Sequence, residues 1–182
     1  MALELGPCAV FFGASGSEVD LGKTNGGVTL RITDDTVDLK SDQFGSAAED
    51  SIITGTNVEV ETALAEVGLS SLAFALGQTA LGSTPSVIAG LNKVGTSMKG
   101  TGKQLILKKF VNGAVSADAK DWIYVPTAAP VSNVELGFDA ENQRVLKVMF
   151  KGYPTTVTAS WASTGVSAKV VTYFFGDSSV TN

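Results

Sequence analysis

Residues 28–40 read VTLRITDDTVDLK, and apolar and polar side chains alternate along most of this stretch. Apolar residues occupy the even positions 28, 30 and 32, and polar residues occupy the positions between them. Alternation with a period of two indicates a half-buried β-strand. Asp34-Asp35 supply a turn, after which alternation resumes with Val37 and Leu39. We therefore expect two strands, residues 28–33 and 36–40, joined as a hairpin.

The same pattern recurs along the chain. A third extended segment is expected at Ile52-Ile53 and residues 57–61, and 138–144 reads as a hairpin connection. One segment differs: apolar residues in 62–76 lie three to four positions apart, which predicts an amphipathic helix capped by Thr62 and Gly77. Further strands are expected at residues 104–110, 121–125, 134–138, 145–150, 155–159 and 170–175.

These elements predict a mainly β fold, a two-sheet sandwich or barrel-like structure with one packed α-helix and long loops. The length of 182 residues fits a single domain over residues 1–182, with an N-terminal arm over about residues 1–25. Exposed strand edges offer unpaired N–H and C=O groups to other chains. Such a chain either blocks its edges or uses them to assemble.

The composition removes most catalytic chemistry. The chain has no His, which excludes Ser-His-Asp triads, Cys-His pairs and His-ligated metal sites. The single cysteine, Cys8, allows neither an internal disulfide nor a Cys-rich zinc site. The 18 acidic residues are spread over strands and turns, as solvated positions are, although two carboxylates could serve a glycosidase. We expect no enzyme, no cofactor and no bound metal.

The glycine-rich stretch 13–27, GASGSEVDLGKTNGG, does not have the spacing of a phosphate loop. Ser17 stands where the first glycine of the motif would be, and Lys23-Thr24 leads into Asn25-Gly26-Gly27 instead of a helix. A surface loop before a strand is expected. The net charge of −5 and scattered bases disfavour specific nucleic-acid binding. No apolar run approaches the roughly 20 residues of a membrane helix, and residues 1–7 do not read as a signal peptide, so a cytosolic product without membrane contact is expected.

Several short motifs follow one another in the first half of the chain. Gly26-Gly27-Val28 opens the first strand, and the charged segment after it ends at Ser41-Asp42-Gln43-Phe44-Gly45. Thr54-Gly55 and the strand Val58-Glu59-Val60-Glu61 then lead into Leu64-Ala65-Glu66, with the expected helix behind.

A late strand completes the series at residues 144–150, followed by Gly152-Tyr153-Pro154. In order and spacing, the motifs in residues 25–76 and 134–154 resemble the major tail tube proteins of long-tailed bacteriophages, within the superfamily that includes type VI secretion tube subunits. Taken singly, each motif is short; the resemblance rests on their order.

The resemblance implies a structural virion protein that self-assembles. Subunits of that family are small β-sandwiches that close into hexameric rings, and the rings stack into a hollow tail tube. Inner sheets of neighbouring subunits join edge to edge. The implied partners are further copies of the chain, a tape-measure protein and a tail terminator, while double-stranded DNA passes through the lumen without specific binding. The implied location is the virion tail, after assembly in the host cytoplasm.

Two groups of residues receive roles from the resemblance together with strand alternation. Alternation turns residues 28, 30, 32, 37, 39, 58 and 60 into the core. The remaining side chains of these strands are expected to face the DNA channel, with a slight acidic excess that repels phosphate: Arg31, Thr33, Asp38, Lys40, Glu59 and Glu61. The second group belongs to a ring-stacking loop over about residues 41–55, expected to be mobile until a neighbouring ring covers it: Asp42, Gln43, Phe44, Ile52 and Ile53.

Two other classes of function fit the same composition. One is a β-sandwich accessory domain that binds a carbohydrate or another ligand on an aromatic platform. Its candidate residues are Trp122, Tyr124, Tyr153, Trp161 and Tyr173. The other is a related ring protein, such as a tail terminator or a type VI secretion tube subunit. The residues assigned to the lumen could equally face solvent on the outside of the molecule.

Overall fold

The computed structural model describes residues 7–40, 42, 46–65, 68–69, 72–73, 76–77, 94–131, 145–162 and 165–176, and these are mainly β-strand. A single 3-10 turn, η1 (Ala119–Asp121), precedes the seventh strand. The strands are β1 (Cys8–Ala14), β2 (Ser17–Asp20), β3 (Thr24–Leu39), β4 (Asp50–Leu64), β5 (Lys103–Val111), β6 (Ala114–Val115), β7 (Trp122–Val131), β8 (Leu146–Gly152), β9 (Thr155–Ala162), β10 (Gly165–Val171) and β11 (Phe174–Phe175).

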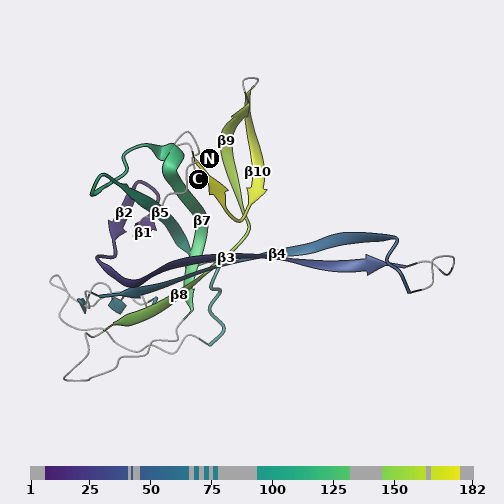
Figure 1. The fold of residues 1–182 in the computed structure, drawn as a ribbon, viewed down its shortest axis with the longest axis horizontal. Coiled ribbons are helices and arrows are strands. Elements are labelled where there is room, and N and C mark those ends of the chain that lie inside the picture. Colours follow the sequence, from purple (N-terminus) through teal and green to yellow (C-terminus); the bar gives the residue numbers. More distant parts are fainter. Residues whose placement is uncertain are drawn as a thin grey trace.

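Nine of these strands form one antiparallel sheet in the order β2-β1-β5-β7-β8-β4-β3, with β11 beside β7 and β6 beside β5 (Figure 1). Among the described strands, β9 and β10 pair only with each other and form a separate hairpin. The predicted mainly β class is confirmed. The strands predicted near residues 104–110, 121–125, 145–150 and 155–159 correspond to β5, β7, β8 and β9.

Strand β7 carries the sheet from one layer to another. Its first half pairs with β5 and its second half pairs with β8. Between Val125 and Ala128 the register against β5 shifts by one residue, and Pro126 in this stretch suits a bulge because proline has no N–H to give to a ladder. Phe12 of β1 contacts Phe150 of β8 with ring centroids 4.9 Å apart, although β5 and β7 separate these strands in the sheet. The sheet therefore folds over on itself.

The core lies between the two halves of this folded sheet. On β4, residues 58, 60, 62 and 64 are buried, while the residues between them are more exposed. Partly buried Val28, Leu30 and Ile32 of β3 pack against the same core. The buried cluster is Val10, Phe12, Leu21, Val58, Val60, Leu64, Leu105, Leu107, Val125, Ala128, Leu146, Val148 and Phe150. The inward placement predicted for residues 28, 30, 32, 58 and 60 is thus confirmed.

The turn predicted at Asp34-Asp35 is wrong. Strand β3 runs through both residues without a break and pairs with β4 from Val28 to Leu39. The carboxylate of Asp34 accepts a hydrogen bond from the Thr56 hydroxyl at 2.6 Å, and that of Asp35 accepts one from the Asn57 amide at 2.7 Å. These cross-strand partners satisfy groups that would otherwise favour a turn.

Because β3 does not turn, its alternation continues without a change of side. Val37 and Leu39 therefore share a side of the strand with Arg31, and they are 53% and 45% exposed instead of buried in the core. Asp38 falls on the opposite side, the one that carries Ile32. The predicted inward placement of Val37 and Leu39 is wrong, for the same reason that the turn was wrong.

Two other expectations need correction. Residues 1–25 were expected to form an arm with a surface loop, but Cys8–Ala14 and Ser17–Asp20 pair as strands of the main sheet. The helix predicted over 62–76 begins later, because β4 continues to Leu64 and buries Thr62. Helical residues occur at 69, 72 and 73, with a hydrogen bond from Leu72 N–H to the Gly68 carbonyl. The strand and connection predicted over 134–144 lie outside the described residues.

The β3–β4 hairpin extends beyond the body that carries it. Strand β8 pairs with β4 no further than Val58, so beyond that point β3 and β4 pair only with each other. We call residues 33–57 the arm; its described parts project as a two-stranded ribbon (Figure 1). The β3 strand of 16 residues spans about 50 Å at roughly 3.3 Å per residue.

Because Phe12 and Phe150 join the two halves of the folded sheet, we expect the stability of the subunit to depend on this contact. Replacing Phe150 with Ala leaves a cavity between β1 and β8 and should lower the free energy of unfolding by about 3–5 kcal/mol. The control is Val94→Ala, at a position that is 90% exposed, which should change it by less than about 0.5 kcal/mol. Urea denaturation of both variants measures the difference, and equal stabilities would contradict this packing.

Candidate functional site

The arm is braced by side chains along its length. Besides the bonds to Asp34 and Asp35, the Thr54 hydroxyl donates to the Asp35 carbonyl at 3.1 Å, and the Ser51 hydroxyl donates to the Asp38 carboxylate at 2.8 Å. An isolated two-stranded ribbon is only marginally stable in water, and cross-strand side-chain pairs stabilise it further. The register shift between Asp35 and Thr36 leaves one extra residue on β4, and such a bulge sharpens the local twist.

Apolar side chains gather beyond this bulge. Val37 lies directly opposite Ile52, so the two share one face of the ribbon with Leu39. Ile53 lies opposite Thr36 on the other face. Ile52 and Ile53 are 50% and 61% exposed. Adjacent exposed apolar residues on a projecting ribbon mark a surface that gains free energy when a partner covers it.

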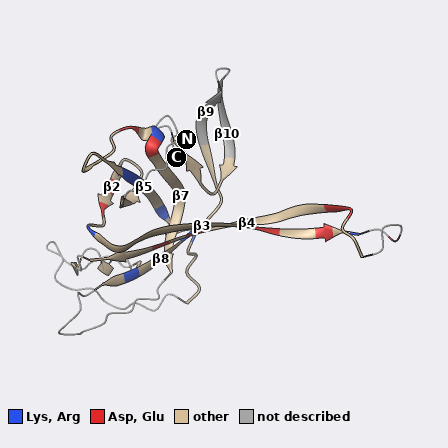
Figure 2. Ribbon diagram, viewed as in Figure 1, with Lys and Arg blue, Asp and Glu red and all other residues tan. Residues whose placement is uncertain are grey.

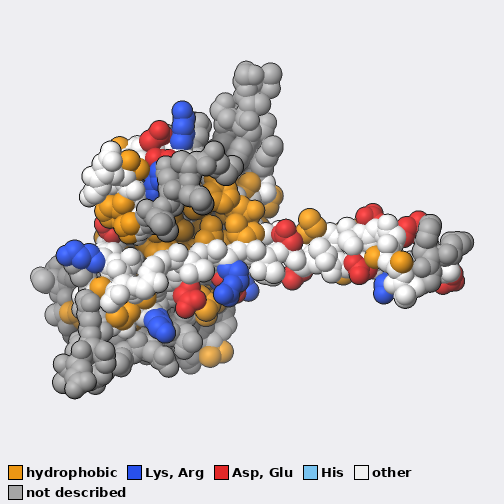
Figure 3. Space-filling view, viewed as in Figure 1, with side chains coloured by type: hydrophobic (Ala, Val, Ile, Leu, Met, Phe, Trp, Pro, Cys, Tyr) orange, Lys and Arg blue, Asp and Glu red, His pale blue; other side chains and the backbone are white. Residues whose placement is uncertain are grey.

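The arm also carries the net charge of the whole chain. Residues 33–57 hold six acids (Asp34, Asp35, Asp38, Asp42, Glu49 and Asp50) and one base, Lys40, which gives 1 − 6 = −5. The remaining residues hold 12 acids and 12 bases, so they sum to zero. In the space-filling view, acidic side chains are the main charged groups on the described part of the arm (Figure 3).

The predicted ring-stacking loop is only partly a loop. Ile52 and Ile53 are strand residues of β4, so the expectation of a loop over residues 41–55 is wrong for residues 50–55. Asp42 lies in the connection between β3 and β4 and is exposed. Gln43 and Phe44 lie outside the described residues.

A second surface lies on the outward face of β3, β4 and β8, away from the core. Arg31 stands opposite Glu59, with 3.7 Å between the guanidinium Nη1 and the carboxylate Oε2. Glu59 in turn stands opposite Lys151 of β8. Lys147 lies further along β8 on the same face, because Leu146 and Val148 on either side of it are buried. Bases and acids therefore alternate across the three strands.

The residues predicted for the lumen divide between two places. The structure brings Arg31, Thr33, Glu59 and Glu61 together on this outward face, whereas Asp38 lies on the arm, on the other side of β3, and Lys40 follows the end of β3. Lys147 and Lys151 were missed, although the alternation of residues 145–150 already placed Lys147 outward. With them the face holds three bases and two acids, so the predicted acidic excess is wrong for this surface.

Both ends of the main sheet are open in the described part of the chain. Strand β3 lies at one end and β2 at the other, and neither has a ladder partner on its outer side. Strand β2 has four residues, whereas β3 has 16. A long edge strand presents a row of N–H and C=O groups to another chain.

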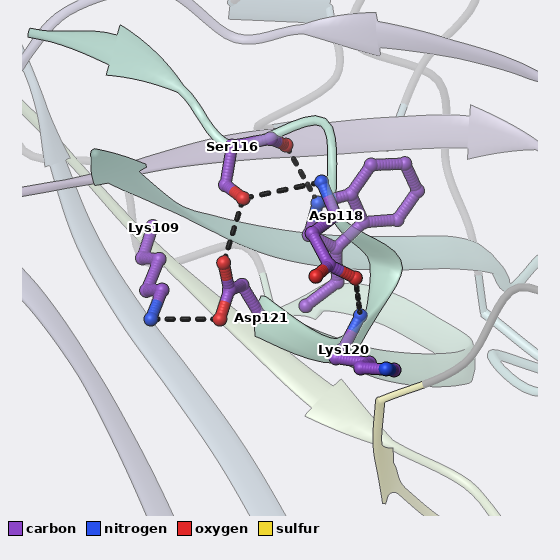
Figure 4. Close-up of polar contacts among 6 residues, drawn as sticks. Lys109, Ser116, Asp118, Lys120 and Asp121 are labelled. Carbon is purple, nitrogen blue, oxygen red and sulfur yellow. Dashed lines mark hydrogen bonds and ion pairs between the residues drawn. The ribbon is translucent and has the colours of Figure 1, made fainter. Parts of the chain in front are cut away.

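The β5–β7 connection contains a polar cluster of a different kind (Figure 4). The Asp121 carboxylate accepts from Lys109 Nζ and from the Ser116 hydroxyl, each at 2.7 Å. The Trp122 indole N–H donates to the Ser116 carbonyl at 2.8 Å, and Asp118 caps η1 by accepting from the Lys120 N–H at 3.0 Å. The hydrogen bonds from Lys109 and then Ser116 lower the pKa of Asp121, so its carboxylate is a weak proton acceptor. The cluster fixes the turn before β7.

Of the aromatic residues considered for a sugar platform, those whose side chains the structure describes do not form one open surface. The ammonium of Lys108 lies 3.7 Å from the ring centre of Trp122 and covers one face of that ring. Tyr124 is buried and stacks on Phe174, with ring centroids 4.7 Å apart. Tyr153 donates to the sulfur of Met98, on a different part of the molecule. The side chain of Trp161 lies outside the described residues.

Tyr173 and Cys8 are both integrated into the packing of the subunit. Tyr173 packs on the core and meets Phe175 edge-on. Cys8 is half-buried against the same core, and burial raises the pKa of its thiol, which disfavours the thiolate.

The described residues hold neither a cluster of metal ligands nor a membrane-spanning helix. No group of three or more His, Cys, Asp or Glu side chains there is placed to hold a metal ion. No helix in the same part of the chain is long and apolar enough to cross a membrane. Comparison of the sequence with protein-family models and with curated proteins gives no match.

The cluster around Asp121 predicts an acid-dependent loss of stability. Because the folded state lowers the pKa of this carboxyl group, its contribution is complete above the ordinary Asp pKa of about 3.9 and is lost as the pH falls through the lowered value. Asp121→Asn should therefore narrow the difference in melting temperature between pH 7 and pH 2.5. The control is Glu61→Gln, which removes an exposed surface charge outside the cluster. If Asp121→Asn and Glu61→Gln change the difference in melting temperature between pH 7 and pH 2.5 equally, the stabilising role of the Asp121 cluster is contradicted.

Proposed function

We propose that this chain is a structural subunit that assembles with copies of itself into stacked rings, and that the rings form a hollow tube like the tail tube of long-tailed phages. The observation that carries the proposal is the arm, a braced ribbon whose apolar end pairs with no other strand described in the subunit. The motif order in residues 25–76 supports the same reading.

The free energy available at the arm is sufficient for an assembly contact. Full burial of a Val, Leu or Ile side chain contributes about 1.5–3 kcal/mol. Val37, Leu39 and Ile52 lie on one face of the ribbon and are each about half exposed, so they would contribute a few kcal/mol when a second subunit covers that face. Bracing of the ribbon by side-chain hydrogen bonds reduces the entropy lost when it docks.

Ring closure is assigned to the open ends of the sheet. If the β3 edge of one copy adds to the sheet of the next, the contact joins two different surfaces, and repetition of such a contact closes a ring. The arm is then available for contacts between rings. Ring closure thus uses the open ends of the sheet, and stacking uses the arm that projects from the body.

The lumen is assigned to the outward face of β3, β4 and β8. The charges of Arg31, Glu59 and Lys151 stand in one cross-strand row, where the carboxylate lies between the two bases and offsets one of them. DNA is held tightly when many phosphates meet unpaired cations, and a mixed row offers few. Such a face suits a conduit occupied first by a tape-measure protein and then by passing DNA, in a virion tail closed by a terminator protein.

Assembly of the purified full-length chain tests the proposal. Concentrated protein should form tubes of stacked rings in negative-stain micrographs. Val37→Asp/Ile52→Asp should abolish tubes because it places two more charges on the apolar face of the arm, while the thermal melt of the subunit stays close to that of the unaltered protein. Val94→Asp, an exposed position away from the arm, is the matched control and should still form tubes.

The contrary results are equally definite. A monomer by light scattering at every concentration, with no tubes after seeding, would refute self-assembly. Single closed rings that never stack would favour a terminator-like protein instead. Normal tubes from Val37→Asp/Ile52→Asp would remove the arm from the assembly contact.

A further inference from the structure

The two ends of the β3–β4–β8 layer differ in charge. The arm, with its net charge of −5, occupies one end. At the other end, Thr24, Leu64 and Leu146 stand in one row across the three strands. Exposed Lys23 immediately precedes Thr24, the first residue of β3, and exposed Lys147 follows Leu146 on β8, while exposed Glu61 of β4 lies three residues from Leu64 toward the arm. Figure 2 shows acidic residues along the arm and basic residues at the far end of β3 and on β8.

The same far end also exposes an apolar side chain. Leu69 is 45% exposed and lies in the helical segment that begins shortly after β4 ends at Leu64. The next apolar residue of that segment, Leu72, packs on the core and so holds the segment against the body. This end therefore offers bases and an apolar contact, which complement the acids and apolar residues of the arm.

We propose that the arm of one copy docks head to tail on this far end of a second copy, with Lys23 and Lys147 facing the acids of the arm. The proposal rests on the self-assembly proposed above and specifies the receiving surface. Contact between two arms is disfavoured because each carries five net negative charges, whereas contact between the arm and the lysine end joins opposite charges. A contact between unlike surfaces gives the filament a direction.

Charge exchange between the two surfaces tests this contact. The arm-reversed variant is Asp42→Lys/Glu49→Lys/Asp50→Lys, which changes the arm from −5 to −5 + 6 = +1. The end-reversed variant is Lys23→Glu/Lys147→Glu. Each variant alone places like charges at both surfaces, so its critical concentration for assembly should rise at least about tenfold, which corresponds to roughly 1.4 kcal/mol.

Mixing the variants should restore assembly. In an equimolar mixture the positive arm of one variant meets the acidic end of the other, and the negative arm of the second meets the lysine end of the first. One chain that carries all five substitutions should also assemble. Lys99→Glu/Lys120→Glu, which reverses two exposed lysines outside the β3–β4–β8 layer, is the control and should assemble like the unaltered chain.

Each alternative result has one meaning. Normal assembly of the end-reversed variant, or a mixture no better than either variant alone, would overturn the proposed receiving surface while leaving self-assembly in place. Normal assembly of the arm-reversed variant alone would indicate that the charge of the arm does not select its partner, and would also overturn it. Failure of the unaltered chain to assemble would instead refute the proposed function. Far-ultraviolet circular dichroism establishes that each variant is folded.

Discussion

The backbone ladder between β3 and β4 makes one long ribbon, and the hydrogen bonds that Asp34 and Asp35 accept from β4 let the ladder continue past these two acids. Two adjacent acids in a β-strand would ordinarily favour a turn, because their carboxylates bond to nearby backbone groups. Here Thr56 and Asn57 provide donors across the ladder, so the strand continues to Leu39. The length of the arm and the exposure of its apolar end both follow from this continuation.

The arm and the body divide the chemistry of the chain between them. The body holds a packed core and, summed over its residues, no net charge, whereas the arm holds exposed apolar residues and all of the net charge. Apolar burial is non-directional and supplies affinity, while charge selects which surfaces meet. In the self-assembly proposed above, repeated contact between copies of the chain would use both, and the contact is expected to weaken as salt screens the charges.

The sequence predicted those strands whose apolar residues form a clear local pattern. Strand β8 and the inward side of β4 were predicted because apolar residues alternate there, and β5 and β7 were predicted because they contain short apolar runs at 105–107 and 122–125. The errors arose where a contact distant in sequence overrides local preference. Asp34-Asp35 signals a turn until Thr56 and Asn57 are placed opposite, and the helical spacing of residues 62–76 hides the fact that Thr62 and Leu64 belong to β4.

The candidate surfaces were predictable to a similar extent. Arg31 and Glu59 were assigned to one face because alternation alone determines their side. Asp38 was assigned to the same face only because a turn was expected, and the loss of that turn moved it to the arm. The pairing of β8 with β4, which adds Lys147 and Lys151 to the outward face, depends on strand order, and alternation within one segment contains no information on strand order.

Amide hydrogen exchange of the full chain, as dilute subunits and as assembled material, tests most directly whether the arm is an assembly surface. In dilute subunits the arm amides should exchange much faster than those of β5 and β8, since a two-stranded ribbon opens easily. On assembly, protection should rise in residues 35–39 and 50–53 while the core strands change little. Equal exchange of the arm in both states, or protection gained only in β9 and β10, would contradict the account.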